Sequence, residues 1–262
     1  MKTINQLLGL ATASLFAVAT TQAQTITVEA SGGGPAQTGF ADTTISSVEV
    51  AGTNNMLLVG IISEGIADNT DTIISWGTDS VTHNNADYIG RNGGNRAAIF
   101  VFENLTAGIN DLIVDTKEDT SGGDNYQVGF LSISATADLN VIENQIFSED
   151  PSVDVTSNTL TFTNDVSNGL LFGVGTNNDQ QTSYLQPFDT IVADSQNNTG
   201  GKWGGSVSYS NATETGQSFD WTIDSANRLG SAAILVEAVP EPSALALLSL
   251  AGFLMVLRRR RA

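Results

Sequence analysis

The run Leu57-Leu58-Val59-Gly60-Ile61-Ile62 has no polar side chain, and three of its six residues are β-branched. A second run, Leu170-Leu171-Phe172-Gly173-Val174, has the same character. Both are short, as strands are, and a strand that is apolar at successive positions buries both of its faces. We therefore expect both runs to be central strands of sheets that are covered on both sides.

Similar short runs rich in β-branched or aromatic residues recur along the chain, separated by loops of Gly, Asn, Asp, Ser and Thr. Nine further strands are predicted: 26–30, 45–50, 97–102, 111–115, 126–134, 159–163, 206–210, 218–224 and 232–238. Strict alternation around Trp221 indicates one buried face and makes this tryptophan a core residue. Because no helical crossovers separate the strands, we expect an all-β fold, a single antiparallel β-sandwich of jelly-roll type.

The two apolar runs share the pattern N-x-L-L-x-G-x, which begins at Asn55 and again at Asn168. Coincidence explains this pattern about as well as an internal duplication does. The body of the chain, residues 24–238, is therefore treated as one unit.

Composition excludes several kinds of chemistry. The 262 residues include no Cys and one His, so thiolate nucleophiles, disulfides and Cys- or His-rich metal sites are excluded. The single histidine, His83, lies in a polar segment, and no G-x-S-x-G pattern suggests a serine nucleophile for it. A formal net charge of −18 makes nucleic acid a poor partner. No catalytic motif is found, so an enzyme is not expected.

The N-terminus has the pattern of a secretory signal peptide. Lys2 is followed by the apolar run 7–19 and by the small-x-small sequence Thr21-Gln22-Ala23. This order predicts a signal helix within residues 1–23 and cleavage after Ala23. The expected partners are the Sec translocon and signal peptidase.

The C-terminus has a different pattern. Val239-Pro240-Glu241-Pro242 precedes an uncharged stretch, 243–257, and then Arg258, Arg259, Arg260 and Arg261. As a transmembrane helix, 15 residues would span only about 22 Å of a hydrocarbon core of about 30 Å. The arginines would hold their end in the cytoplasm by the positive-inside rule, with the exported body on the other side. An ordinary single-pass anchor is the alternative.

Residues 239–262 resemble the PEP-CTERM sorting signal of Gram-negative bacteria, in which a Pro-Glu-Pro motif, a short hydrophobic segment and a basic tail follow in this order. The resemblance implies an inner-membrane exosortase that recognises Pro240, Glu241 and Pro242 and removes the tail, in bacteria that make exopolysaccharide. The protein would then be anchored transiently in the inner membrane before it reaches the cell surface or the extracellular matrix.

The body is strongly acidic. Five of the 10 basic residues lie in the two termini and Glu241 is the one acid outside 24–239, which leaves 27 acids and five bases, a net charge of −22. The body is also similar, more loosely, to an uncharacterised bacterial surface β-sandwich module. The likeness consists of an L-L-V-G strand at 57–60, the turn Trp76-Gly77, an aromatic strand after Arg96 and a closing apolar strand at 232–236.

Candidate binding residues are of two kinds. Trp203, Trp76 and Tyr88 are candidates for stacking on sugar rings. Asp68, Asp71, Asp119 and Asp124 are candidate ligands of a structural calcium ion, the one cofactor left open. We expect an exported structural or adhesive β-sandwich with exopolysaccharide as a candidate ligand. The alternative is a polysaccharide-acting hydrolase, whose paired carboxylates leave no spacing rule in a sequence.

Overall fold

The computed structural model describes residues 25–38, 42–64, 73–82, 88–92, 95–115, 125–148, 154–164, 166, 168–177, 184–185, 190–194, 204–212 and 217–239. These residues form strands and connecting turns without a helix, and every strand pair among them is antiparallel. The prediction of an all-β, antiparallel fold is confirmed. The two terminal helices predicted from the sequence lie outside the described residues.

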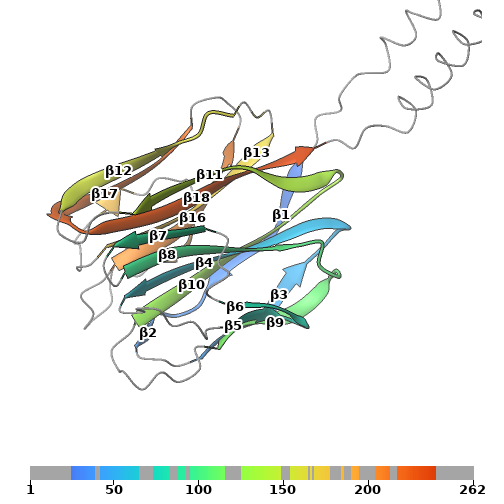
Figure 1. The fold of residues 1–262 in the computed structure, drawn as a ribbon. Coiled ribbons are helices and arrows are strands. Elements are labelled where there is room, and N and C mark those ends of the chain that lie inside the picture. The colour runs from blue at the N-terminus through green and yellow to red at the C-terminus, as the bar shows by residue number, and fades with distance from the viewer. Residues whose placement is uncertain are drawn as a thin grey trace, which may run out of the picture.

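The strands form four sheets stacked as layers (Figure 1). Sheet A contains, in spatial order, β1 (Ile26–Gly33), β10 (Asn125–Ala135), β4 (Asn54–Glu64), β8 (Asn95–Glu103) and β7 (Tyr88–Asn92), with β2 (Gln37–Thr38) beside β10. Sheet B contains β3 (Thr43–Val50), β9 (Gly108–Asp115), β5 (Ile73–Trp76) and β6 (Asp79–Thr82). Sheet C contains β11 (Asp138–Ser148), β18 (Leu229–Val239), β13 (Gly169–Asn177), β16 (Gly204–Ala212) and β15 (Thr190–Asp194). Sheet D contains β12 (Val155–Thr161), β17 (Ser218–Asn227) and β14 (Tyr184–Leu185).

Three hydrophobic cores separate the layers in the order B, A, C, D. Leu57 packs between sheets A and B, Phe172 between A and C, and Trp221 between C and D. Sheets A and C are therefore covered on both faces, as their fully apolar central strands β4 and β13 predicted. A single sandwich would have two sheets and one core. The described residues form four sheets and three cores, because sheets A and C are both apolar on their two faces and each face needs a covering layer.

The second half of the chain repeats the topology of the first. Sheets A and B are built from β1 to β10, and sheets C and D from β11 to β18. In each half the first strand pairs with the last, the last with the central strand (β4 or β13), and that strand with β8 or β16. In the outer sheets β3 pairs with β9 and β12 with β17 in the same way. The order β1, β10, β4, β8, β7 thus corresponds to β11, β18, β13, β16, β15.

A β-bulge lies at the same place in both halves. In β1 the register shifts between Val28 and Ala30, and in β11 it shifts between Val141 and Glu143. A bulge inserts one extra residue and bends its strand, so a matching pair is a detailed likeness. The repeat therefore extends from the strand order to the local backbone.

The shared sequence pattern is one residue out of register with this repeat. Counted across the ladders from the bulges, Met56 corresponds to Leu170, and both side chains pack in the central core. The pattern N-x-L-L-x-G-x instead aligns Leu57 with Leu170, although Leu57 faces sheet B. Because side chains alternate along a strand, a shift of one residue exchanges the two faces. The repeat is thus visible in the topology and not in the pattern that suggested it.

All eleven predicted runs overlap strands, whereas seven of the strands in the described part of the chain were not predicted. The longest of these is β11, with 11 residues. It is an edge strand of sheet C, its residues include Asn140, Glu143, Asn144 and Gln145, and its bulge interrupts the alternation. An edge strand tolerates polar residues because one side of it faces solvent, so its sequence lacks the apolar run that marks central strands.

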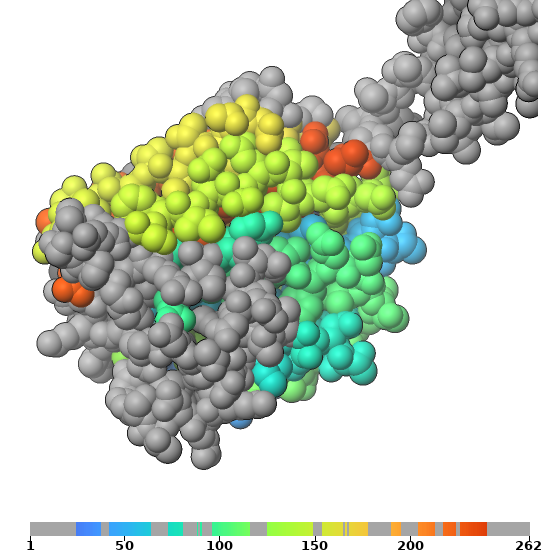
Figure 2. All heavy atoms as spheres, in the orientation of Figure 1, coloured from blue at the N-terminus to red at the C-terminus, as the bar shows by residue number. Residues whose placement is uncertain are grey.

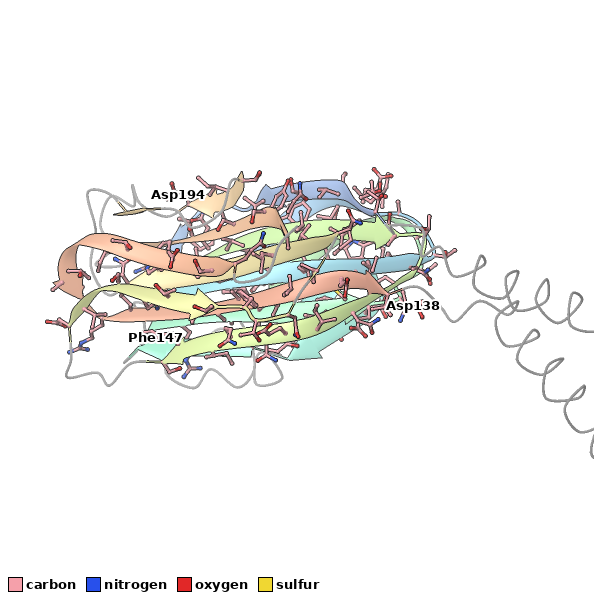
Figure 3. The ribbon with its side chains drawn as sticks, turned by 90° about the horizontal axis from the view of Figure 1, so that it is seen from above. Asp138, Phe147 and Asp194 are labelled. Atoms are coloured by element: carbon pink, nitrogen blue, oxygen red, sulfur yellow. The ribbon has the colours of Figure 1, made fainter. Side chains whose placement is uncertain are left out.

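The described chain begins and ends at the same end of the stack. Val239 pairs with Asp138, and Ile26 pairs with Ala135. Figure 3 shows Asp138 at this end, with Phe147 and Asp194 toward the opposite one. We call the end defined by Ile26, Asp138 and Val239 the terminal end.

Candidate functional site

A hollow opens where the edge of sheet A meets the edge of sheet C. It has a volume of about 380 Å³ and is lined by Tyr88 of β7, Val101 and Glu103 of β8, and Asn140 and Val141 of β11. Figure 2 looks onto the side of the stack where the yellow-green surface of β11 meets the green surface of sheet A. Pockets that bury a drug-sized ligand commonly begin at about 300 Å³. This Tyr88 hollow is therefore large enough for a sugar ring and its neighbours.

Cross-strand pairing explains why three of these side chains share one face. Tyr88 pairs with Ile99 in the neighbouring strand, and Val101 and Glu103 follow Ile99 at every second position. Alternate residues of a strand point to the same face, which here is the one toward sheet C. The half-buried Tyr88 also packs against the central core. The ring is thus held by the fold at the rim of the central layer.

Two polar side chains of the hollow, those of Glu103 and Asn140, are available to a ligand. Neither the Glu103 carboxylate nor the Asn140 side-chain amide makes a hydrogen bond or ion pair within the part of the chain that the structure describes. A carboxylate accepts hydrogen bonds, and an amide both donates and accepts them. The surface that the lining exposes in the hollow is mainly polar, so these groups offer hydrogen bonds to a ligand and little apolar area. Donors and acceptors together are what the hydroxyl rim of a sugar requires.

Trp76 is not a sugar-stacking residue. Its side chain is 1% exposed in the core between sheets A and B, and its Nε1–H donates a hydrogen bond of 3.1 Å to the Val48 carbonyl. A buried indole has no face to offer to a sugar, so this prediction is wrong. Trp76 is the last residue of β5 and points into this core. Trp221 lies in the core between sheets C and D, as its alternating pattern predicted.

Several other candidates lie outside the described residues. They are Trp203, the calcium candidates Asp68, Asp71, Asp119 and Asp124, the cleavage residue Ala23, the motif residues Pro240, Glu241 and Pro242, and the arginines Arg258 to Arg261. Val239 is described and is the last residue of β18. No three His, Asp or Glu side chains gather as a metal site within the described ranges. Those ranges also contain no helix long and apolar enough to cross a membrane.

Among the described residues, two titratable groups have shifted pKa values, and neither lines the Tyr88 hollow. Burial raises the pKa of Tyr126 to about 12, against the effect of its hydrogen bond of 2.8 Å with the Thr43 hydroxyl. Burial also raises the pKa of Glu143, but hydrogen bonds from the backbone N–H groups of Asn164 and Thr163 outweigh it, with help from the side chains of Gln145 and Thr163. The pKa of Glu143 is therefore lowered. Both groups stabilise connections between sheets.

No family model, curated protein or solved structure matches the chain. The chemistry of the site therefore rests on its own residues.

Sequence reasoning identified one of the three side chains that give the Tyr88 hollow its chemistry. Tyr88 was predicted from its residue type, whereas Glu103 and Asn140 were not. Glu103 directly follows the apolar run 97–102, and a carboxylate at the end of a buried strand is a weak signal for a surface site. Asn140 had no signal at all, because it lies on β11 and reaches the hollow only through the stacking of the two halves.

Proposed function

We propose that this protein is an exported, exosortase-processed component of the cell surface or extracellular matrix that adheres to carbohydrate. Its export and its processing by an exosortase are supported by sequence features alone. These are the signal pattern that ends at Ala23 and the sorting pattern that begins at Val239. Export through the Sec translocon, cleavage by signal peptidase and transient anchoring in the inner membrane follow from these features. Attachment of both flanking segments at the terminal end is compatible with such an anchor.

Each half is proposed to be a sandwich of the jelly-roll type. A jelly roll has eight strands in two sheets, in which the chain folds as two Greek keys. In each half the first and last long strands pair in the inner sheet, and the second and next-to-last pair in the outer sheet. This nested pairing supports the assignment.

The Tyr88 hollow supports carbohydrate as the ligand. The single observation that carries the proposal is the half-buried Tyr88 ring beside two uncommitted polar groups, Glu103 and Asn140. The carboxylate in the hollow and the net charge of −22 on the body would repel uronic acids and other anionic sugars. We therefore propose a neutral polysaccharide as the ligand.

The hydrolase alternative receives less support from this hollow. Glycoside hydrolysis needs two carboxyl groups about 5 to 10 Å apart across the scissile bond. Glu103 is the one acid among the described residues that line the hollow. Binding without turnover is therefore the function that its chemistry favours.

The proposed function is tested by binding and turnover on one panel of sugars. The purified protein is titrated with glucose hexasaccharides of α-1,4, β-1,4 and β-1,3 linkage, with dextran and with the acidic polysaccharide alginate. Binding of a neutral sugar is expected, without release of reducing ends. Tyr88→Ala should weaken it at least about fivefold, because truncating an aromatic anchor costs more than about 1 kcal/mol. Tyr88→Phe should retain most of the affinity, since it keeps the ring.

A matched control is Thr159→Ala, which changes an exposed residue of β12 on the far side of sheet D. If Tyr88→Ala and Thr159→Ala bind alike, the Tyr88 hollow is not the binding site. If reducing ends appear with the native protein and disappear with Glu103→Gln, the hydrolase replaces the adhesive module.

The sorting signal is tested separately. Replacing Glu241 by Ala should leave the C-terminal tail attached, which mass spectrometry of the envelope fraction would detect. Normal removal of the tail from this variant would argue against recognition of the Pro-Glu-Pro motif.

A further inference from the structure

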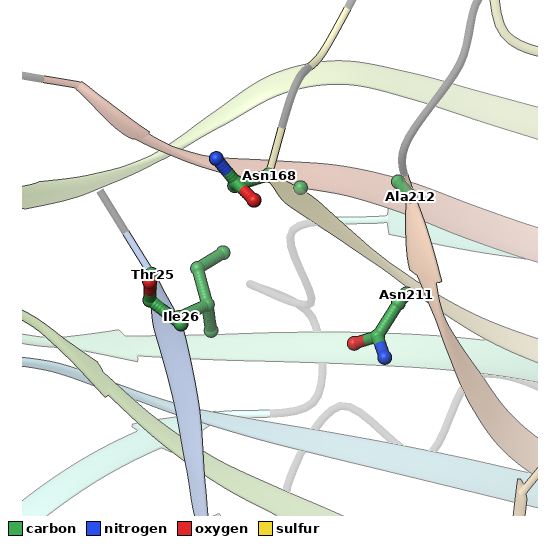
Figure 4. A pocket seen from close by; sticks show the side chains of 6 residues that line it. Thr25, Ile26, Asn168, Asn211 and Ala212 are labelled. Carbon is green, nitrogen blue, oxygen red and sulfur yellow. The ribbon is translucent and has the colours of Figure 1, made fainter. Parts of the chain in front are cut away.

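A second hollow lies at the other edge of the central layer. It has a volume of about 210 Å³ and is lined by Thr25, Ile26, Asn168, Gly169, Asn211 and Ala212. Figure 4 shows Ile26 and the two asparagine side chains around one space, each on a different segment of the chain. Thr25 and Ile26 belong to the first half of the chain, and the other four residues belong to the second. We call it the Asn211 hollow.

The topological repeat places the two hollows at corresponding edges of the central layer. The Tyr88 hollow lies where the end of β8 meets β11, and the Asn211 hollow lies where the end of β16 meets β1. β16 is the counterpart of β8, and β1 is the counterpart of β11. Within the ladders, Glu103 pairs with Met56 and Asn211 pairs with Leu170, so these two polar residues occupy corresponding positions. An amide thus stands where the first hollow has a carboxylate.

The two amides of the Asn211 hollow have no other role in the described chain. Neither the Asn168 nor the Asn211 side chain makes a hydrogen bond within the residues that the structure describes. Asn55, the residue that matches Asn168 in the sequence pattern, is fully used: its amide donates to the carbonyls of Gly52 and Leu105, and its side-chain oxygen accepts from the Leu105 N–H. The contrast shows that the fold can bury such an asparagine and does not do so at Asn168.

We infer that the Asn211 hollow is a second carbohydrate-binding site, which takes a single neutral sugar residue. This inference rests on the proposed function of the Tyr88 hollow. Two amides and the Thr25 hydroxyl supply both donors and acceptors for sugar hydroxyls, and Ile26 supplies an apolar contact. No charged side chain is among the residues that line it, so it suits a neutral sugar. Its smaller volume, compared with about 380 Å³ for the first hollow, limits it to about one ring.

Two sites on opposite edges of the central layer make each molecule bivalent. Tyr88 lies on β7 and Ile26 on β1, the two opposite edges of sheet A, so one glycan chain does not fill both hollows without wrapping around the body. A bivalent protein bridges two glycan chains and gains avidity on a polymer. The protein therefore cross-links chains of a neutral polysaccharide in addition to adhering to them.

The test counts binding sites by calorimetry with the same three glucose hexasaccharides. The native protein should bind two equivalents, Asn211→Ala and Tyr88→Ala one each, and the double variant none. Asn168→Ala should weaken the second site by several fold and leave the first unchanged. Asn144→Ala, at an exposed asparagine of β11 away from both hollows, is the matched control and should retain two sites.

Bridging is tested with high-molecular-mass dextran by dynamic light scattering. The native protein should increase particle size, and each single-site variant should bind without doing so. One equivalent in the native protein, unaffected by Asn211→Ala, would overturn the second site and leave the proposed function intact. If Asn211→Ala abolishes binding and Tyr88→Ala leaves it unchanged, the Tyr88 hollow is rejected as a binding site and the Asn211 hollow is retained. Absence of binding to every sugar would reject both.

Discussion

Asn55 and Asn168 begin the same sequence pattern, yet the fold uses them differently. Asn55 is 2% exposed, and its side-chain amide donates a hydrogen bond to the Leu105 carbonyl and accepts one from the Leu105 N–H. Asn168 lines a hollow between the two halves and is partly exposed. The halves share a topology, but the sequence pattern is one residue out of register with it. Two asparagines that match in the pattern therefore occupy different structural positions. A repeat of topology therefore does not imply a repeat of chemistry.

The largest expected effect is at this pair. Asn55→Ala should lower the free energy of unfolding by about 3 kcal/mol, because it leaves buried N–H and carbonyl groups without partners. Asn168→Ala should change it by less than about 0.5 kcal/mol, as partly exposed substitutions usually do. Urea unfolding midpoints measure both. Equal midpoints for the two variants would contradict the difference drawn between these residues.

A second comparison concerns glycines that permit close packing in each half. A Cβ on Gly60 would lie 2.7 Å from Val207 in the central core, and one on Gly175 would lie 2.5 Å from the Trp221 ring in the outer core. Gly60→Ala and Gly175→Ala should each cost about 2 kcal/mol through overpacking. Gly108→Ala is the control, because its nearest contact would be an ordinary 3.8 Å, to Asn110. Thermal unfolding that separates neither variant from Gly108→Ala would refute the close packing.

A smaller effect is expected at Glu143, whose counterpart in the first half is Ala30. The Glu143 carboxylate accepts hydrogen bonds of 2.9 Å from the Thr163 and Asn164 N–H groups and so ties sheet C to the end of β12. Glu143→Gln should cost about 1 kcal/mol, since the site is accessible to solvent and its charge is screened. Glu49→Gln, at an exposed glutamate of β3, is the control and should have no measurable effect.

The same carboxylate predicts a pH dependence. The folded-state pKa of Glu143 lies below its ordinary value of 4.5. Its stabilisation is therefore present above that value and lost as the pH falls through the lower folded-state pKa. The difference in stability between the native protein and Glu143→Gln should accordingly be constant near neutral pH and shrink in acid. A difference that persists unchanged at pH 2 would contradict this account.

The sequence predicted the fully buried strands well and the edge strands and short strands poorly. Leu57 to Ile62 is recognisable because burial on both faces requires apolar residues at every position. β11 was missed because an edge strand has no such requirement. Trp76 was a candidate for a binding surface from its aromatic type, whereas its inward direction depends on the pairing of β5 with β9. Of the Tyr88 hollow, only the aromatic residue has a type that suggests a site by itself.

By itself, the sequence determined that the body is all-β, that two of its strands are buried on both faces and that its charge is strongly negative, because these properties depend on local pattern and composition. The tertiary structure decided that the chain forms two topologically equal halves stacked through sheets A and C. It also decided which polar side chains meet at the edges of that stack. Such side chains come from different halves, as Glu103 and Asn140 do in the Tyr88 hollow. A local sequence pattern carries no information about the distance between two segments that approach only after both sheets have formed.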